Sequence, residues 1–299
     1  MTDLSFQQYY QKKLESFESF LHASFQKLPA PVETLEQSMK YSLFAGGKRI
    51  RPILMLTTIE CSNKNSSFAL PFACALEYIH TYSLIHDDLP CMDDDELRRG
   101  KPTNHIKFGE DIALLAGDAL LTHAFCLISQ SAIDDATQAE TKLKIVHLLA
   151  EKAGVFGMVS GQVADIQNKI HIDREKTLSF IHSHKTGALI TASIQIGALL
   201  AEVDEDTYNC LTGFGEEIGT CFQIQDDILD QIGSTEKLGK TPGSDSRNET
   251  LTFPLVYGLE ESANLANTHY DRALEYLKST NLNSERLREI ADFVLKRDH

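Results

Sequence analysis

Residues 67–100 read SFALPFACALEYIHTYSLIHDDLPCMDDDELRRG, a long apolar run that leads into a dense cluster of acids. The part over 67–88 is almost continuously apolar, which predicts a helix buried on most of its faces. The acids are Asp87, Asp88, Asp93, Asp94, Asp95 and Glu96. Carboxylates about 5 Å apart repel by roughly 3 kcal/mol per pair at an effective dielectric near 20. Such crowding indicates that the acids either face water or surround a cation.

Helical periodicity dominates the rest of the chain. The stretch 32–47 repeats apolar residues at helical spacing and ends at Gly46-Gly47, and Pro52 suits the first turn of the next helix. Further helices are predicted over 111–129, 139–154, 173–201, 205–233, 253–279 and 284–297. No β-hairpin signal, linker or repeat is found. We therefore expect an all-α bundle of about ten or more helices that forms a single domain over residues 1–299.

Composition and charge narrow the function classes. The formal net charge of −15 argues against a nucleic-acid partner, because binding a phosphate backbone needs a basic face. The start of the chain lacks the apolar core of a signal peptide, and the most apolar run, 187–201, is too short and too polar to span a bilayer. The six cysteines form no CxxC pair and are typical of buried thiols in a reducing compartment. These features predict a cytoplasmic protein without a membrane span.

A second acidic cluster lies in FQIQDDILD, residues 222–230. Asp226 and Asp230 are four residues apart, so they share a helix face, and apolar residues interleave with them. Oxygen ligands without a nearby His or Cys pair favour Mg²⁺, which takes one or two carboxylates and completes its shell with water and phosphate oxygens. Two acidic clusters, each after an apolar run, therefore predict magnesium sites.

In the first cluster, Asp93 lies six residues beyond Asp87, out of phase on an ideal helix. Pro90 removes a backbone donor, and we expect a bulge over 89–91 that returns Asp93 to the face of Asp87. The alternative for both clusters is a pair of unrelated, solvent-exposed acidic turns.

Basic residues lie near both clusters in the sequence. The motif GGKRIRP (46–52) places Lys48 and Arg51 in a Gly-rich turn before a helix N-terminus, where an anion is favoured. Further candidates are His80, Arg98, Arg99, Lys185 and Lys240. Each has a plain alternative: solvated charges, neutralisation of the acids or, for His80, a core histidine. Together, magnesium-binding acids and scattered cations in an apolar helical cavity suit a diphosphate ester with a hydrocarbon tail.

The motifs resemble those of the trans-isoprenyl diphosphate synthases, in particular the short-chain bacterial farnesyl diphosphate synthases. The resemblance covers nearly the whole chain and rests, in order, on GGKRIRP, EYIHTYSLIHDDLPCMDDDELRRGKPTNH, GEDIALLAGDALL, HKTGALI, GFGEEIGTCFQIQDDILD and LGKTPGSD. It implies the isoprenoid synthase fold, with helices around a deep central cavity, and a homodimer. It also implies a prenyltransferase that uses Mg²⁺ to condense isopentenyl diphosphate with dimethylallyl and geranyl diphosphate to farnesyl diphosphate.

The resemblance assigns roles to the residues that match the motifs. Magnesium would be held by Asp87, Asp93 and Asp226, with Asp88, Asp227 and Asp230 behind them. The allylic diphosphate would be bound by Arg98, Lys185 and Lys240. Its C–O bond would ionise, and the resulting allylic cation would be stabilised by Thr186 and Gln223. Isopentenyl diphosphate, held by Lys48, Arg51, His80 and Arg99, would attack with its double bond and lose a proton to the released diphosphate.

Two positions bear on specificity and activity. Tyr82 and Ser83 stand one turn before Asp87, and the bulky Tyr82 would floor the cavity and favour a fifteen-carbon product; simple core packing is the alternative for Tyr82. Thr250 stands where the family usually has a second lysine, and Arg247 is a candidate replacement for its charge.

Other functions remain open at this point. The main alternative is a geranylgeranyl diphosphate synthase of the same family. A terpene cyclase is disfavoured, because such enzymes normally lack the second aspartate motif and the Lys48, Arg51 and His80 site, all of which this chain keeps. A non-catalytic partner subunit predicts eroded aspartates, whereas both motifs are intact and only Thr250 favours that interpretation.

Overall fold

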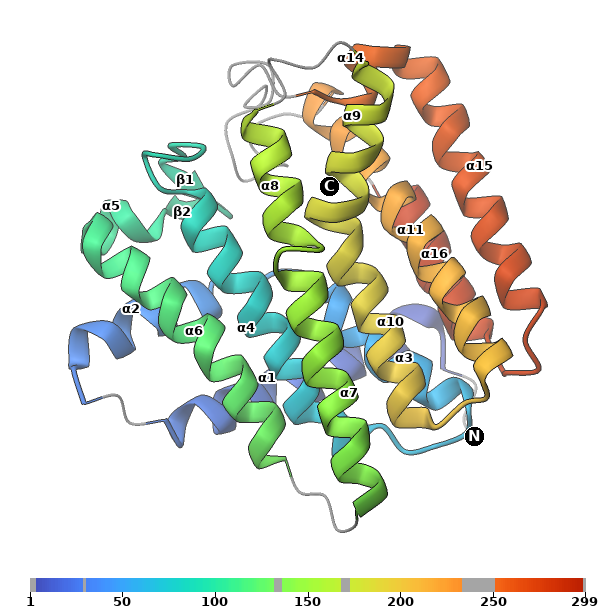
Figure 1. Cartoon of the computed structure of the whole chain (residues 1–299), viewed down its shortest axis with the longest axis horizontal. Coiled ribbons are helices and arrows are strands. Elements are labelled where there is room, and N and C mark those ends of the chain that lie inside the picture. Colours follow the sequence, from blue (N-terminus) through green and yellow to red (C-terminus); the bar gives the residue numbers. More distant parts are fainter. Residues whose placement is uncertain (1–3, 29–30, 132–135, 168–172, 233–250, 298–299) are drawn as a thin grey trace.

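The computed structural model describes residues 4–28, 31–131, 136–167, 173–232 and 251–297. Its helices form an all-α bundle, as the sequence predicts, with one two-stranded hairpin among the described residues (Figure 1). The elements are α1 (Phe6–Gln26), α2 (Glu33–Leu43), α3 (Ile50–Cys61), η1 (Ser67–Ala69), α4 (Leu70–Asp87), β1 (Leu97–Arg98), β2 (Lys101–Pro102), α5 (Asn104–Phe108), α6 (Glu110–Gln130), α7 (Ala136–Ala153), α8 (Met158–Ile166), α9 (Arg174–Ile181), η3 (His182–Gly187), α10 (Ala188–Ala201), α11 (Glu205–Ile232), α14 (Phe253–Tyr257), α15 (Leu259–Lys278) and α16 (Glu285–Lys296).

Helix α4 is buried and packs against α3 and α6. Apolar side chains occupy nearly all of its faces, and Pro71 suits its first turn because the missing backbone donor would have no helical partner there. Leu76 and Ile79 are fully buried. The prediction of a buried helix that leads into acids is confirmed, since α4 ends at Asp87.

Helix α10 is the second buried helix and packs between α3 and α11. Gly197 permits the close approach to α3, because a β-carbon there would lie 2.7 Å from the carbonyl oxygen of Met55. Two hydrophobic clusters meet along α3 and α10. One contains residues of α4 and α6, and the other contains residues of α11, α15 and α16.

The predicted helix over 173–201 is interrupted in its middle. Helix α9 passes into the π-helical turn η3 and then into α10, without a change of direction (Figure 1). Lys185 and Thr186, two predicted site residues, both lie in this turn. A π-turn inserts a residue into a helix and is frequent at functional sites.

Other parts of the fold correct the sequence reading. The expected absence of a hairpin is wrong at residues 97–102, where β1 and β2 pair around Arg99 (φ +53°) and Gly100 (φ +73°). Such a turn needs two positive φ angles and is usually announced by Asn-Gly or Asp-Gly, so Arg-Gly is a poor signal. Gly258, with φ +83°, separates α14 from α15 inside the stretch predicted as one helix. Helices α1, α5 and α8 are absent from the predicted set.

Two features expected from composition can be compared with the structure. The run 187–201 is not among the described helices long and apolar enough to cross a membrane, as expected, but helix α6 is, judged by length and composition alone, and 33% of its most apolar window is buried. All six cysteines are free. Cys61, Cys74 and Cys221 are buried, but Cys91 is exposed, so the expectation of buried thiols holds only in part.

Candidate active site

A cavity of about 800 Å³ brings most of the predicted site residues together. Its lining includes Lys48, Arg51, His80, Tyr82, Ser83, Asp87, Arg98, Arg99, Lys185, Thr186 and Asp226. These side chains come from α3, α4, β1, η3, α11 and the turns beside them. Apolar residues such as Met158, Val163 and Leu189 line the same cavity. The site therefore joins carboxylates, cations and apolar surface in one enclosure.

The first acidic cluster turns back on itself after α4. The amide of Asp93 donates to the carbonyl oxygen of Asp87 at 2.9 Å, and the amide of Asp94 donates to that of Leu89 at 3.2 Å. A turn beyond the helix end, rather than the expected bulge within a helix, thus returns Asp93 to Asp87. Burial raises the pKa of Asp87 to about 6 although Lys185 opposes the rise, and the charge of Asp93 adds to it.

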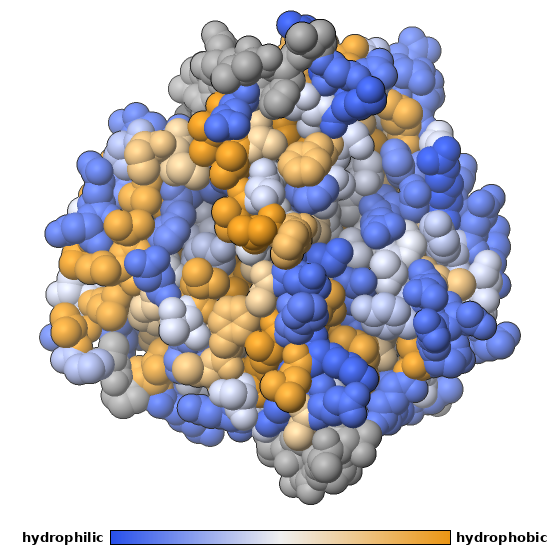
Figure 2. Space-filling model, in the orientation of Figure 1, coloured by the Kyte–Doolittle hydropathy of each residue, from blue (hydrophilic) through white to orange (hydrophobic). Residues whose placement is uncertain are grey.

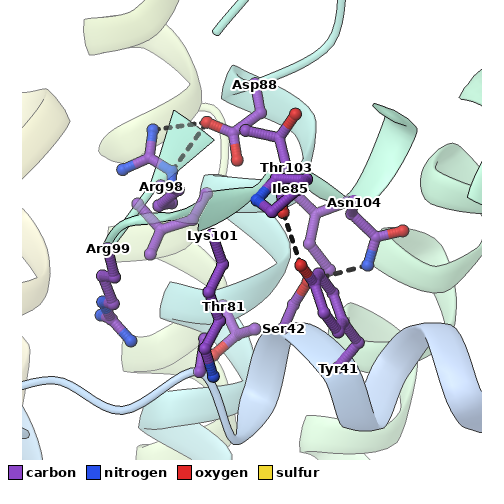
Figure 3. A pocket seen from close by; sticks show the side chains of 13 residues that line it. Tyr41, Ser42, Thr81, Ile85, Asp88, Arg98, Arg99, Lys101, Thr103 and Asn104 are labelled. Atoms are coloured by element: carbon purple, nitrogen blue, oxygen red, sulfur yellow. Dashed lines mark hydrogen bonds and ion pairs between the residues drawn. The ribbon is translucent and has the colours of Figure 1, made fainter. Parts of the chain in front are cut away.

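Arg98 neutralises Asp88 at the edge of this cluster. Its Nε and Nη2 lie 2.7 and 2.6 Å from the Asp88 carboxylate, and Asp95 is 3.7 Å away. Figure 3 shows Arg98 and Asp88 directed toward each other beside a smaller pocket, with Arg99 directed away from them. Burial raises the pKa of Asp88, and Arg98 opposes that rise. Arg98 also lines the large cavity, so neutralisation of Asp88 does not remove it from the site.

Lys48, Arg51 and Arg99, from the Gly-rich turn, the start of α3 and the hairpin turn, form a second group of cations in the cavity lining, together with His80 of α4. Arg99 donates to the carbonyl oxygen of Gly46, and a β-carbon on Gly47 would lie 2.7 Å from the Arg99 guanidinium carbon. Burial lowers the pKa of Arg99 to about 10, which leaves it charged at neutral pH. The pKa of His80 is lowered by burial and by Arg51 and Arg99, so its imidazole is neutral. Several cations held close together in a cavity favour an anionic ligand.

Arg49, which lies between two predicted ligands, has a structural role that the sequence did not indicate. Its guanidinium donates to Glu77 at 2.5 Å, to Glu18 at 2.7 Å and to the carbonyl oxygen of Leu43 at 2.8 Å. Burial works against its charge, but Glu77 and Glu18 outweigh burial and raise the pKa of Arg49. Arg49 therefore ties the start of α3 to α1 and α4 and fixes the turn that carries Lys48 and Arg51.

Lys185 forms its ion pair with a residue that no motif predicted. Its Nζ lies 2.6 Å from Oδ2 of Asp165 in α8. Burial lowers the pKa of Lys185, but Asp165, Asp87 and Asp93 outweigh burial and raise it. A signal was available, because Gln162 and Asp165 are spaced three apart among apolar residues, much as the acids of α11 are.

The aspartates of the second cluster point to different partners. Asp226 lines the cavity with 46% of its side chain exposed and pairs with Arg297, another unpredicted residue, at 2.8 Å. Asp227 is buried and accepts hydrogen bonds from the amide of Phe253 at 2.9 Å and from Nε2 of Gln223 at 2.8 Å. Asp227 therefore anchors the start of α14. Gln223, unlike Thr186, is not one of the residues that line the cavity.

The proposed floor and the loop after α11 complete the set of predicted residues. Tyr82 lines the cavity, is 6% exposed and packs edge-on against the ring of His86. Ser83 donates to the carbonyl oxygen of His80 at 2.9 Å. Lys240, Arg247 and Thr250 lie outside the described residues.

The donor atoms suit magnesium only together with a ligand. Among the described residues, no group of three or more His, Cys, Asp or Glu side chains is arranged to hold a metal. Asp87, Asp93 and Asp226 nevertheless supply the carboxylate oxygens that Mg²⁺ prefers, and the raised pKa of Asp87 marks a charge that a cation would stabilise. Since Mg²⁺ needs only one or two carboxylates when phosphate completes its shell, these residues fit a cation that binds with a diphosphate.

An all-α bundle in which carboxylates and cations share one partly apolar cavity is the arrangement that the motifs predicted for binding a diphosphate ester with a hydrocarbon tail. The chain belongs to the polyprenyl synthetase family, whose sequence model matches residues 32–293. The resemblance noted from the motifs is therefore confirmed.

Individual relatives agree with this assignment. The chain is 42% identical over 299 residues to the farnesyl diphosphate synthase of Geobacillus stearothermophilus, covering 100% of both chains. It is 46% identical over 263 residues to the geranylgeranyl diphosphate synthase of Cyanophora paradoxa, covering 88% of this chain and 87% of the relative. A crystal structure of a geranyltransferase from Helicobacter pylori, complexed with magnesium and isoprenyl diphosphate, is similar with a TM-score of 0.85 and 33% identity, covering 99% and 98% of the two chains.

Proposed function

We propose that the chain is a farnesyl diphosphate synthase, which condenses isopentenyl diphosphate with dimethylallyl and then geranyl diphosphate. The observation that carries the proposal is that Asp87 and Asp226, from different helices, share one cavity with two groups of cations. Similarity over the full length to a farnesyl diphosphate synthase supports the product.

The allylic diphosphate binds on the acidic side of the cavity. Lys185, Arg98 and Lys240 would attract its oxygens, and Asp87, Asp93 and Asp226 would hold Mg²⁺. When bound, Mg²⁺ neutralises the diphosphate and makes it a better leaving group. The hydrocarbon tail extends along the apolar lining.

Isopentenyl diphosphate binds on the cationic side. Lys48, Arg51 and Arg99 supply positive charge, and the neutral imidazole of His80 donates a hydrogen bond. The Arg49–Glu77 pair keeps the turn that carries Lys48 in place. The two diphosphates are thus bound by different groups of residues.

In the reaction, the C–O bond of the allylic substrate breaks and its electron pair leaves with the diphosphate. Thr186, which lines the cavity, presents its oxygen dipole to the allylic cation, and Gln223 would do the same if its side chain turned toward the cavity, which it does not line. For Gln223 the hydrogen bond from Nε2 to Asp227 leaves the amide oxygen available for this role. The double bond of isopentenyl diphosphate attacks the cation, and the proton that is lost passes to the released diphosphate. No protein nucleophile takes part, and electrostatic stabilisation provides the rate enhancement.

Tyr82 sets the product length as the floor of the cavity, where it is held against His86. A smaller side chain at this position would let the chain grow, so the bulk of Tyr82 favours fifteen carbons over twenty. Similarity to a geranylgeranyl diphosphate synthase keeps the twenty-carbon product as the second candidate.

A product assay tests the proposal. Purified protein is incubated with Mg²⁺, isopentenyl diphosphate and dimethylallyl diphosphate, and the dephosphorylated alcohols are sized by gas chromatography. Farnesol is the expected product. Geranylgeraniol would retain the chemistry and overturn the role of Tyr82. The absence of condensation would overturn the enzyme assignment, favour a non-catalytic partner subunit and direct attention to Thr250.

We further propose that residues 1–299 form one cytoplasmic domain that pairs with a second copy and does not span a membrane. Sharing of α3 and α10 between the two hydrophobic clusters supports one domain. Exposed apolar residues on α6 and just before α8, namely Leu114, Leu115, Val155 and Phe156, support an interface, and Figure 2 shows hydrophobic side chains gathered over this face. Phe156→Asp should shift the protein from dimer to monomer in sedimentation velocity, and unchanged sedimentation would argue against this interface.

A further inference from the structure

Helix α8 brings a carboxylate to the one lysine of the π-turn. Oδ2 of Asp165 lies 2.6 Å from Nζ of Lys185, with 11% and 25% of the two side chains exposed. Lys185 lines the cavity, whereas Asp165 is not among the described residues that line it. Asp165 therefore acts on the cavity through Lys185.

The backbone is shaped for this pair. A β-carbon on Gly161 of α8 would lie 2.2 Å from the amide nitrogen of Lys185, so only glycine allows α8 to pack this closely against η3. The π-turn moves Lys185 out of the regular helical register. Two unusual local features thus place the ammonium one turn of α8 away from Gly161, at Asp165.

The carboxylate of Asp165 is only partly satisfied. Its Oδ1 is buried and has no hydrogen-bond partner within the described part of the chain, and the same is true of both amide atoms of Gln162, three residues earlier. A carboxylate with a purely structural role usually has both oxygens bonded, because an unsatisfied buried oxygen is costly. The unbonded Oδ1 of Asp165 therefore favours a role in which this carboxylate positions the Lys185 ammonium for a ligand.

Three carboxylates attract the same ammonium. Asp87, Asp93 and Asp165 all favour the charged form of Lys185, but the ion pair is made with Asp165. If Asp165 lost its charge, Lys185 would be drawn toward Asp87, which the proposed function assigns to magnesium. Lys185 is thus paired with Asp165 while the charges of Asp87 and Asp93 also act on it.

We propose that Asp165 is a positioning residue, which holds Lys185 at the point from which it binds the allylic diphosphate and keeps Lys185 away from Asp87. The inference rests on the proposed function, since it assumes that an allylic diphosphate binds beside Asp87.

Asp165→Asn tests the inference through separate kinetic constants for the two substrates. We expect kcat/KM for geranyl diphosphate to fall about 10- to 100-fold, the loss typical of a hydrogen bond between charged groups. The KM for isopentenyl diphosphate should stay within about twofold, because the residues assigned to it do not include Lys185, the ion-pair partner of Asp165. Asp165→Glu, which restores the charge, should recover part of the loss.

A double-mutant cycle separates positioning from folding. In a Lys185→Met background, Asp165→Asn should have no further effect on geranyl diphosphate kinetics, because its action passes through Lys185. Glu140→Gln is the matched control, since Glu140 pairs with Lys144 at 2.8 Å on the exposed surface of α7, and it should leave both KM values unchanged.

Two results would overturn the inference. One is an equal rise of both KM values together with a lower melting temperature, which indicates a structural role. The other is a full effect of Asp165→Asn in the Lys185→Met background. If the wild-type protein forms no product, calorimetric binding of inorganic pyrophosphate with Mg²⁺ still decides: about tenfold weaker binding to Asp165→Asn supports positioning while the proposed function fails, and equal binding rejects both.

Discussion

Glu77→Gln should destabilise the protein far more than the loss of an ordinary ion pair. Glu77 and Arg49 have side chains that are 2% and 1% exposed, and their charged atoms lie 2.5 Å apart. The substitution keeps the size and shape of the side chain but removes its charge. Arg49 is then buried with Glu18 as its remaining carboxylate partner at 2.7 Å.

The expected cost follows from this geometry. Removal of one partner of a buried ion pair typically costs about 3–5 kcal/mol, because the other charge remains desolvated. We expect a loss of about 3 kcal/mol in the free energy of unfolding, at the lower end of that range, because glutamine can still accept a hydrogen bond and Glu18 stays in contact. For a chain of this size, this corresponds to a fall of about 6 °C in melting temperature.

Urea and thermal unfolding followed by circular dichroism measure this loss. The matched control is Glu202→Gln, because Glu202 and Lys64 lie 2.6 Å apart but are 61% and 37% exposed. Exposed ion pairs contribute under about 1 kcal/mol, so Glu202→Gln should leave the free energy of unfolding almost unchanged. If both variants lose the same stability, burial does not decide the importance of the Arg49–Glu77 pair, and the assigned role of Arg49 is wrong.

Three further predictions concern the site itself. Asp87→Asn should lower turnover by about 10² or more, since one electrostatic stabiliser is lost; rates across a Mg²⁺ titration test this, and near-normal turnover without Mg²⁺ dependence would contradict the metal assignment. Tyr82→Ala should lengthen the product, as sized by gas chromatography of the dephosphorylated alcohols; a product that stays at fifteen carbons means that Tyr82 is not the floor. The pKa of His80 is lowered by burial below its ordinary 6.5, so the unfolded state binds an extra proton below that pH. As the pH is lowered below 6.5, this group should therefore decrease the free energy of unfolding by up to about 1.4 kcal/mol per pH unit. Urea unfolding of His80→Asn between pH 5 and 8 should show a weaker dependence of that free energy on pH.

Much of the fold was predictable because its signals are local. Apolar periodicity predicts α2, α3, α4, α6, α7, α11 and α16, since each helix must bury one face or all faces. The interruption at η3 was not predictable, because a π-turn depends on the close packing of α8 against it, as Gly161 shows. The hairpin at 97–102 was missed because its turn places Arg99 at a positive φ. Glycine or asparagine is the usual residue at such a position, and its presence would have indicated the turn.

The candidate site divides in the same way. The sequence by itself determined the family, the two acidic clusters and the charged residues near them, because motif spacing along a chain is a local property. The tertiary structure decided which charges face the cavity. Lys48 lines the cavity beside Arg49, which also pairs internally with Glu77, a residue 28 positions away.

The same distinction separates the neighbouring acids Asp226 and Asp227. Asp226 faces the cavity, whereas Asp227 holds the amide of Phe253, 26 residues further along the chain. Sequence alone cannot assign different roles to two adjacent aspartates. Burial and partners that are distant in the sequence, not residue type, determine whether a carboxylate is paired within the protein or can bind a ligand.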